Sequence, residues 1–337
     1  MRTCLVGSEM CIRDSLLLTT ILILSSVNLF AQGTPHVKIF SNFNFDMDSE
    51  PEYASKGFEI KRAYLGYKYN LSDDFSTKIT FDVGKNGAGS NYTAFLKIAS
   101  LSWQASDKLN LSFGMIGTQN FKFMENAWGK RYIYKSFMDE NKWASSADAG
   151  ANLKYTVSDN LTIDAQVLNG EGYKNLQSDN QFRGGAGITY NTDDISFRVS
   201  RDMIPRTMYG DDYDAQYINT FAAIYSGSNI TLGGEYNLRE NTSFVVDNTS
   251  TAFSVYGSLD IGNDVSIFGR YDLSDSEDAN ENQWNIDNEG ELTIVGIEKQ
   301  MTKGVKVALN VKSYKAATAD DDAEANNMLY LNLEYKF

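Results

Sequence analysis

Alternation between apolar and polar residues, repeated along most of the chain, is the feature that most limits its fold. In the stretch 75–84, Phe81 falls on one side of an extended chain, whereas Lys78 and Asp82 fall on the other. A period of two predicts a β-strand with one apolar and one polar face. The pattern predicts sixteen strands, at 36–47, 57–70, 75–84, 93–104, 108–117, 148–158, 160–169, 181–191, 194–204, 216–226, 229–238, 251–262, 264–274, 290–301, 304–314 and 328–337.

The connections between these stretches alternate between short turns, such as 71–74, and long polar loops, such as 274–289. This asymmetry, the even strand number and the strand length are typical of outer-membrane barrels. We therefore predict an all-β fold, a transmembrane antiparallel up-and-down β-barrel of 16 strands, with short periplasmic turns and long extracellular loops. A soluble β-sandwich would show the same alternation, so the strand pattern alone does not separate the two folds.

The beginning of the chain predicts export. The apolar run Leu16–Gln32 is too short for a spanning helix and contains small residues near its end, so residues 1–31 are predicted to be a signal peptide. Residues 1–15 lack the basic character of a normal leader, which fits either a gene-prediction artefact or a long atypical leader. The barrel domain is then residues 32–337, which contain no cysteine, in the outer membrane of a Gram-negative cell.

One connection departs from the pattern. Residues 118–147 form a long stretch rich in aromatic and charged side chains, and loops of this length usually have a function. We predict a constriction loop that folds into the barrel and narrows its lumen; a folded cap outside the barrel would have the same composition. The charged residues assigned to the constriction are Lys122, Glu125, Lys130, Arg131, Asp139 and Glu140.

The polar strand faces predict a charged lumen wall, and rings of charge set the selectivity of pores. Paired charges in a polar lumen can also be purely structural. The predicted wall is slightly basic, although the whole chain has a net charge of −14. This negative net charge argues against nucleic acid as a partner. The basic residues assigned as pore-lining are Lys38, Arg62, Lys78, Arg183, Arg198, Arg270 and Lys306, with Lys154 and Lys312 on the same face. The acidic residues are Asp82, Asp164, Glu235, Asp260 and Asp272.

The residue inventory gives no support for catalysis. His36 is the single histidine, so neither a Ser-His-Asp triad nor a histidine-based zinc site is supported. The absence of cysteine from residues 32–337 removes thiol chemistry as well. We expect no enzymatic activity, no metal and no cofactor.

Several segments resemble the phosphate-selective porin O/P family. The stretch Gly57–Gly84 resembles its second and third strands, the step at Asn169–Gly172 resembles its Asn-Gly-x-Gly step, and the segment around Arg270 resembles its thirteenth strand. The resemblance implies a sixteen-stranded, usually trimeric outer-membrane porin whose anion selectivity depends on lumen arginines and lysines. Arg62 and Arg270 match the family pattern, whereas Lys61 stands where the family has an arginine, and Glu125, Asp139 and Glu140 balance the bases of the constriction loop; both are departures from the phosphate-selective pattern.

The last predicted strand, 328–337, alternates to its final residue. We predict that it pairs with the first strand, and that Tyr335 and Phe337 resemble the signal read by the barrel-assembly machinery. The other expected partners are outer-membrane lipid and lipopolysaccharide, a homotrimer, and small solutes or inorganic ions. We predict a porin for passive diffusion with at most a mild anion preference. The alternatives are a surface-binding or adhesion barrel without an open channel, and a secreted all-β binding protein.

Overall fold

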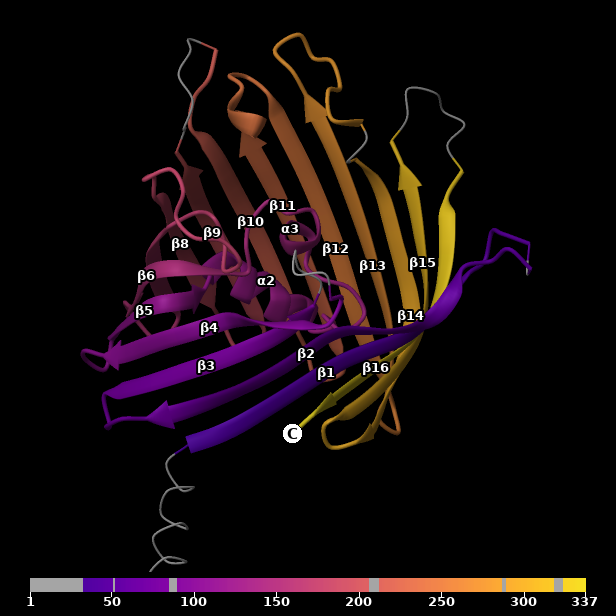
Figure 1. Ribbon diagram of the computed structural model, residues 1–337, viewed down its shortest axis with the longest axis horizontal. Helices are drawn as coiled ribbons and strands as arrows, with labels where there is room; N and C mark the ends of the chain where they lie inside the picture. Colours follow the sequence, from indigo (N-terminus) through magenta and orange to yellow (C-terminus); the bar gives the residue numbers. More distant parts are fainter. Residues whose placement is uncertain (1–32, 51, 85–89, 206–211, 287–288, 318–323) are drawn as a thin grey trace, which may run out of the picture.

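The computed structural model describes residues 33–50, 52–84, 90–205, 212–286, 289–317 and 324–337. Within them, sixteen antiparallel strands close into a barrel in which each strand pairs with its neighbours in sequence and β1 pairs with β16 (Figure 1). The predicted signal peptide lies outside the described residues. The strands are β1 (Gly33–Asp46), β2 (Lys56–Asn70), β3 (Phe75–Gly84), β4 (Thr93–Gln104), β5 (Leu109–Gly117), β6 (Ala147–Thr156), β7 (Leu161–Leu168), β8 (Arg183–Asn191), β9 (Ile195–Ile204), β10 (Gln216–Ser226), β11 (Ile230–Glu240), β12 (Thr249–Gly262), β13 (Val265–Glu277), β14 (Gly290–Thr302), β15 (Val305–Ala316) and β16 (Asn326–Lys336).

The sixteen-stranded barrel predicted from the sequence is confirmed, and no strand end differs from its predicted position by more than three residues. The barrel closes where β1 meets β16, in a register that places Ile39 opposite Tyr335. The backbones of Val37 and Phe337 exchange two hydrogen bonds, of 2.9 and 3.1 Å. Closure leaves no strand edge exposed for pairing with another chain.

The two faces of the strands have opposite characters, and the apolar face is outside. Phe113 is 70% exposed and Val167 is 55% exposed, whereas the lumen residues Thr220 and Asn237 are fully buried. A soluble sandwich would bury its apolar face, so this inversion argues against the soluble alternative. An apolar outer surface suits a closed barrel in lipid, because closure lets neighbouring strands satisfy their backbone hydrogen bonds within the sheet. No helix in the described part of the chain is long and apolar enough to cross a membrane.

Two β-bulges interrupt the register on one side of the barrel. Between β1 and β2, Phe40 pairs with Arg62 and Ser41 with Ile60, so Lys61 is the extra residue. Between β3 and β4 the pairing passes from Leu96 to Ile98, so Lys97 is the extra residue. A bulge bends its strand and redirects a side chain. Here the second bulge leaves Lys97 buried in the lumen, only 7% exposed.

Apolar residues also face part of the lumen. Ile218 on β10 and Leu292 and Ile294 on β14 are at most 5% exposed. They lie opposite the connection between β5 and β6, which contains helices α2 (Gln119–Trp128) and α3 (Phe137–Glu140). The apolar part of the lumen wall is therefore the surface on which this connection packs.

Candidate functional site

The connection between β5 and β6 lies inside the barrel. Figure 1 shows α2 and α3 between the front strands β1–β5 and the strands behind them. Three residues of α2 at four-residue spacing, Asn120, Met124 and Trp128, are buried, so one face of the helix packs on the wall. The helix ends at Gly129, whose φ of 65° is left-handed and whose N–H donates to the Glu125 carbonyl, as is common for a helix-terminating glycine.

Polar contacts fix both ends of α2 against different strands. At its start, the Asn120 amide donates to Asp202 at 2.9 Å, and Arg198 donates to the Asn120 carbonyl at 2.7 Å; both partners are on β9. Beyond its end, the Tyr132 hydroxyl donates to Glu298 on β14 at 2.6 Å. The predicted constriction loop is therefore bound to two separate parts of the lumen wall, β9 and β14.

An apolar contact completes the attachment. The Trp128 ring packs edge-on against Tyr256 and Phe268, with centroid distances of 5.5 and 6.3 Å, and Tyr132 lies 6.3 Å from Phe40. Buried aromatic side chains of this size dominate packing energies, at roughly 3–5 kcal/mol each when truncated to alanine. The connection is therefore held to the wall of β12–β14 by apolar packing as well as by hydrogen bonds.

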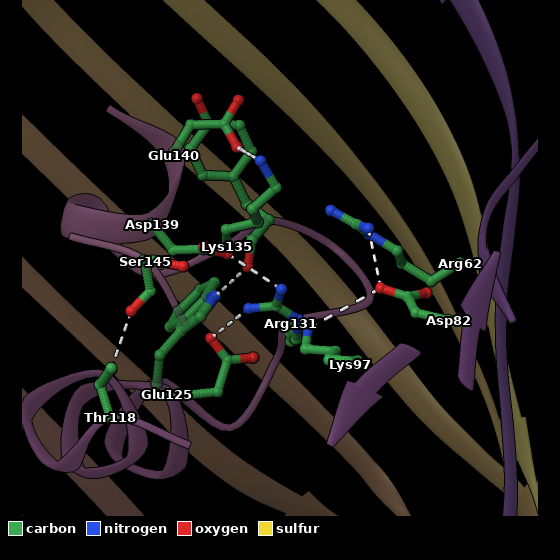
Figure 2. Close-up of polar contacts among 12 residues, drawn as sticks. Arg62, Asp82, Lys97, Thr118, Glu125, Arg131, Lys135, Asp139, Glu140 and Ser145 are labelled. Atoms are coloured by element: carbon green, nitrogen blue, oxygen red, sulfur yellow. Dashed lines mark hydrogen bonds and ion pairs between the residues drawn. The ribbon is translucent and has the colours of Figure 1, made fainter. Parts of the chain in front are cut away.

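On the opposite side of the lumen, two wall cations meet one carboxylate (Figure 2). Arg62 on β2 donates to Asp82 on β3 at 2.9 Å, and the Lys97 ammonium lies 3.8 Å from the same carboxylate oxygen. Lys97 also lies 5.0 Å from the Tyr64 ring centroid and 5.3 Å from that of Tyr173, a cation–π arrangement. The three charged residues leave one net positive charge.

Arg131 of the connection faces this wall cluster and is itself neutralised (Figure 2). Its guanidinium lies 2.8 Å from Glu125 and 2.9 Å from Asp139, and its Nε donates to the Tyr64 hydroxyl at 3.3 Å. Burial acts to lower the pKa of Arg131, but Tyr64, Glu125 and Asp139 outweigh it and raise that pKa well above its usual value. Burial raises the pKa of the Glu125 carboxyl, although Arg131 opposes this rise. Arg131 therefore stays charged, whereas the Glu125 carboxyl is protonated more easily than an ordinary glutamate.

Two cavities adjoin the cluster from opposite ends of the barrel. The first, about 510 Å³, is at the long-loop end and is lined by Arg62 and Arg131. The second, about 580 Å³, is lined by Lys97 and by residues of the short-turn end such as Asn110. Because Arg62 and Lys97 contact the same carboxylate, Asp82, the cluster stands between the two cavities.

The predicted pore-lining residues fall into two groups. Arg183, Arg198 and Arg270 are at most 5% exposed and are bound to Asp202, Asp164 and Asp272, at 3.5, 2.6 and 2.7 Å. Their role in the structure is to brace the wall. Lys306 shares Glu298 with Lys130 of the connection. Arg198 and its partner Asp164 also border the short-turn cavity. The other predicted residues that border the two cavities are Arg62, Lys78, Lys122, Arg131, Lys154 and Glu140, the last bound to Lys135 at 2.9 Å.

Other predicted residues lie away from the cluster. The Lys38 ammonium lies 5.9 Å from the Phe40 ring centroid, and Glu235 is buried beside Asn237. His36 hydrogen-bonds to Thr80 at 3.1 Å. The described residues contain no group of three or more His, Cys, Asp or Glu side chains that could hold a metal ion.

Sequence reasoning missed three residues of the cluster: Lys97, Tyr64 and Tyr173. The alternation near 93–104 was compatible with two registers, so the sequence did not predict which side chains face the lumen. The bulge that directs Lys97 inward cannot be recognised from the apolar pattern. Tyr173 belongs to the loop between β7 and β8, outside any strand pattern. These residues come together only through the closed barrel.

Comparisons with known proteins define the class of fold. OprB of Pseudomonas putida superimposes with a TM-score of 0.71 at 10% identity, covering 93% of this chain and 96% of that one. An anion-selective porin from Comamonas acidovorans gives 0.67 at 11% identity, over 90% and 99% of the two chains. OmpT of Vibrio cholerae in its trimer form gives 0.61 at 14% identity, over 91% and 100%. No protein-family model and no curated protein matches the sequence.

The fold is that of the sixteen-stranded outer-membrane porins. Together with the exposed apolar face of its strands, this fold places the barrel in the outer membrane of a Gram-negative bacterium. At these low sequence identities the comparisons show a shared fold and nothing more, so membership of the phosphate-selective family remains a prediction.

Proposed function

We propose that this protein is an outer-membrane porin that lets small hydrophilic solutes and ions diffuse passively, with a mild preference for anions. The observation that carries the proposal is the charged cluster of Arg62, Asp82 and Lys97, which stands between a cavity from each end of the barrel. Barrels of this strand number commonly enclose an aqueous channel. The proposal includes no enzymatic activity and no cofactor.

The charge balance supports a mild preference rather than a strong one. At the narrow part, Arg62, Lys97 and Arg131 are matched in number by Asp82, Glu125 and Asp139. In the short-turn cavity, Lys78, Lys122 and Lys154 form no ion pair within 4.0 Å among the described residues. A neutral constriction beside a basic cavity raises the local anion concentration without a strong binding site. Phosphate specificity, which the family resemblance suggests, would need more excess positive charge at the constriction.

Planar-bilayer recording tests the proposal. Purified protein should give stepwise conductance, and the reversal potential in a KCl gradient should indicate a modest preference for chloride. Bilayers that contain the folded protein but show no conductance steps would instead support the adhesion barrel. Strong block by phosphate would show that the constriction binds anions more tightly than its balanced charges imply.

We also propose a homotrimer in contact with outer-membrane lipid and lipopolysaccharide, inserted by the barrel-assembly machinery. The support for trimerisation is the similar fold of the Vibrio cholerae OmpT barrel, described in a trimer form. Light scattering on detergent-solubilised protein, corrected for bound detergent, should give three times the mass of one chain. A mass of one chain in mild detergent would contradict the trimer and leave the channel proposal intact.

A further inference from the structure

A third cavity, of about 510 Å³, lies at the long-loop end beside the connection between β5 and β6. It is bounded by the turn after α3, the ends of β11 and β15, and the loop before β14. Three cationic side chains line it: Lys142, Arg239 and Lys312. This volume is within the range of small-molecule sites in proteins, roughly 300–1,000 Å³.

The cations of this cavity differ from the bracing arginines elsewhere in the lumen. Among the described residues, none of Lys142, Arg239 and Lys312 has a carboxylate within 4.0 Å. The one acidic residue in the cavity lining, Glu140, is bound to Lys135 at 2.9 Å. The positive charge of the cavity is therefore not neutralised by any ion pair within the described chain, although Glu289 acts on Arg239 and Glu140 on Lys312 at longer range.

The guanidinium of Arg239 is supported by an aromatic ring and retains an unused hydrogen-bond donor within the described chain. Its guanidinium lies 4.4 Å from the ring centroid of Trp143, which supports the flat cation on one side. Its Nε is buried and has no hydrogen-bond partner within the described part of the chain. Glu289 lies near by, but Gln283 donates to it at 2.7 Å and it forms no ion pair with Arg239. A buried donor without an acceptor is costly, so an incoming acceptor would relieve that cost.

The rest of the lining selects the kind of anion. Trp284 and Tyr314 add aromatic surface, and Asn141, Ser243 and Asn326 add hydrogen-bonding groups. The Asn141 amide N–H₂ donates to the Phe137 carbonyl at 3.0 Å, and no bond to its own carbonyl oxygen is present in the described chain. A simple inorganic anion has no apolar face to pack on the aromatic rings. A benzoate-like ligand has no hydroxyl groups to hydrogen-bond with the amides.

We propose that this cavity binds a small sugar acid of the hexuronate type. Its carboxylate would lie against Arg239, with Lys142 and Lys312 near by, its hydroxyls against the amides, and a ring face against Trp284 or Tyr314. Bidentate contact with a carboxylate is the interaction that a guanidinium makes best. This inference goes beyond the porin proposal and does not depend on it, since binding at this site requires no conduction.

Tryptophan fluorescence tests the proposal, because Trp143 and Trp284 both line the cavity. The full-length barrel in detergent is titrated with D-glucuronate, D-glucose, benzoate and inorganic phosphate at constant ionic strength. We expect a saturable change with glucuronate, at least about tenfold weaker binding of glucose, and no saturable change with benzoate or phosphate. Absence of saturation with glucuronate overturns the site, and equal binding of phosphate or benzoate overturns the ligand class.

Two variants assign the response to the cavity. Arg239→Gln should weaken glucuronate binding at least about tenfold, towards the affinity of glucose. Lys312→Gln should weaken it less, and serves as the second test if Arg239→Gln reduces the yield of folded barrel. The matched control is Arg201→Gln at the same end of the barrel, because Arg201 is 52% exposed and pairs with Glu240 away from the cavity. Unchanged glucuronate binding in folded Arg239→Gln and Lys312→Gln would overturn the assignment.

Discussion

Lys97 is placed in the lumen by a single extra residue in β4, and it contributes one of the two positive charges on Asp82. Replacing it with methionine keeps the bulk of the side chain and leaves the Arg62–Asp82 pair neutral. We expect the chloride-to-potassium permeability ratio to fall at least about twofold, because removing one unit charge about 8 Å away in water changes the energy of each ion by about 0.5 kcal/mol, in opposite directions. Reversal potentials in a KCl gradient measure this, with Lys108→Met in an exposed short turn as the control. A ratio that does not change would remove Lys97 from the ion path.

Glu125 makes the same cluster sensitive to pH. Because burial raises the pKa of Glu125, this carboxyl becomes neutral at a higher pH than an ordinary glutamate. Arg131 remains charged throughout, so acidification adds net positive charge beside Lys97 and Asp139. The chloride preference should therefore rise as the pH falls through the range in which Glu125 takes up its proton, above the range of an ordinary glutamate. In Glu125→Gln the preference should already be high at pH 7 and change less on acidification; a wild-type pH response in this variant would assign the effect to other carboxyls.

At the scale of elements, the strands were predictable and the lumen connection was only partly so. Period-two alternation indicates a strand independently of its surroundings, and both ends of β3 were therefore predicted at the residues where the structure has them. The length of the connection predicted its importance, but not that α2 would pack on the wall. Packing of the connection on the wall explains why Ile294, beside Trp128 of α2, and Ile218, beside Phe137 of α3, face inward although a lumen is usually polar. These inward residues satisfy a contact with residues far along the chain, which local periodicity does not contain.

The attachment of the connection makes Trp128 the residue that most affects its position. Trp128→Ala removes the packing on Tyr256 and Phe268 and should cost about 3–5 kcal/mol of local stability. The barrel should still form, because its strand pairing does not involve this residue. We expect a larger and noisier single-channel conductance, and faster hydrogen exchange in the segment 119–140. Trp103→Ala is the matched control, since Trp103 stacks on Phe75 on the outer face, and its conductance should equal that of the wild type.

At the scale of the whole molecule, net charge is a poor guide to the ion path. The chain carries a net charge of −14, yet the short-turn cavity is lined by Lys78, Lys122 and Lys154, which form no ion pair with the residues that the structure describes. Much of the acid lies in long loops such as 274–289, at the opposite end of the barrel. Fields from exposed charges decay within about 10 Å at 0.1 M salt. An ion inside the barrel therefore responds to the nearby lysines rather than to the distant loops.

This separation predicts how selectivity depends on salt. The chloride preference should be clear at 0.1 M KCl and fall towards unity at 1 M, where the Debye length shrinks to about 3 Å. Neutralising the three cavity lysines together, as Lys78→Gln, Lys122→Gln and Lys154→Gln, should remove most of the preference at 0.1 M while preserving conductance steps. A control that replaces Asp275 and Glu277 at the end of β13, and Asp278 in the loop after it, with their amides should leave the permeability ratio unchanged, because these groups are at the far end. If the loop variant shifts the ratio more than the lysine variant does, the acidic loops rather than the lumen set the ion preference.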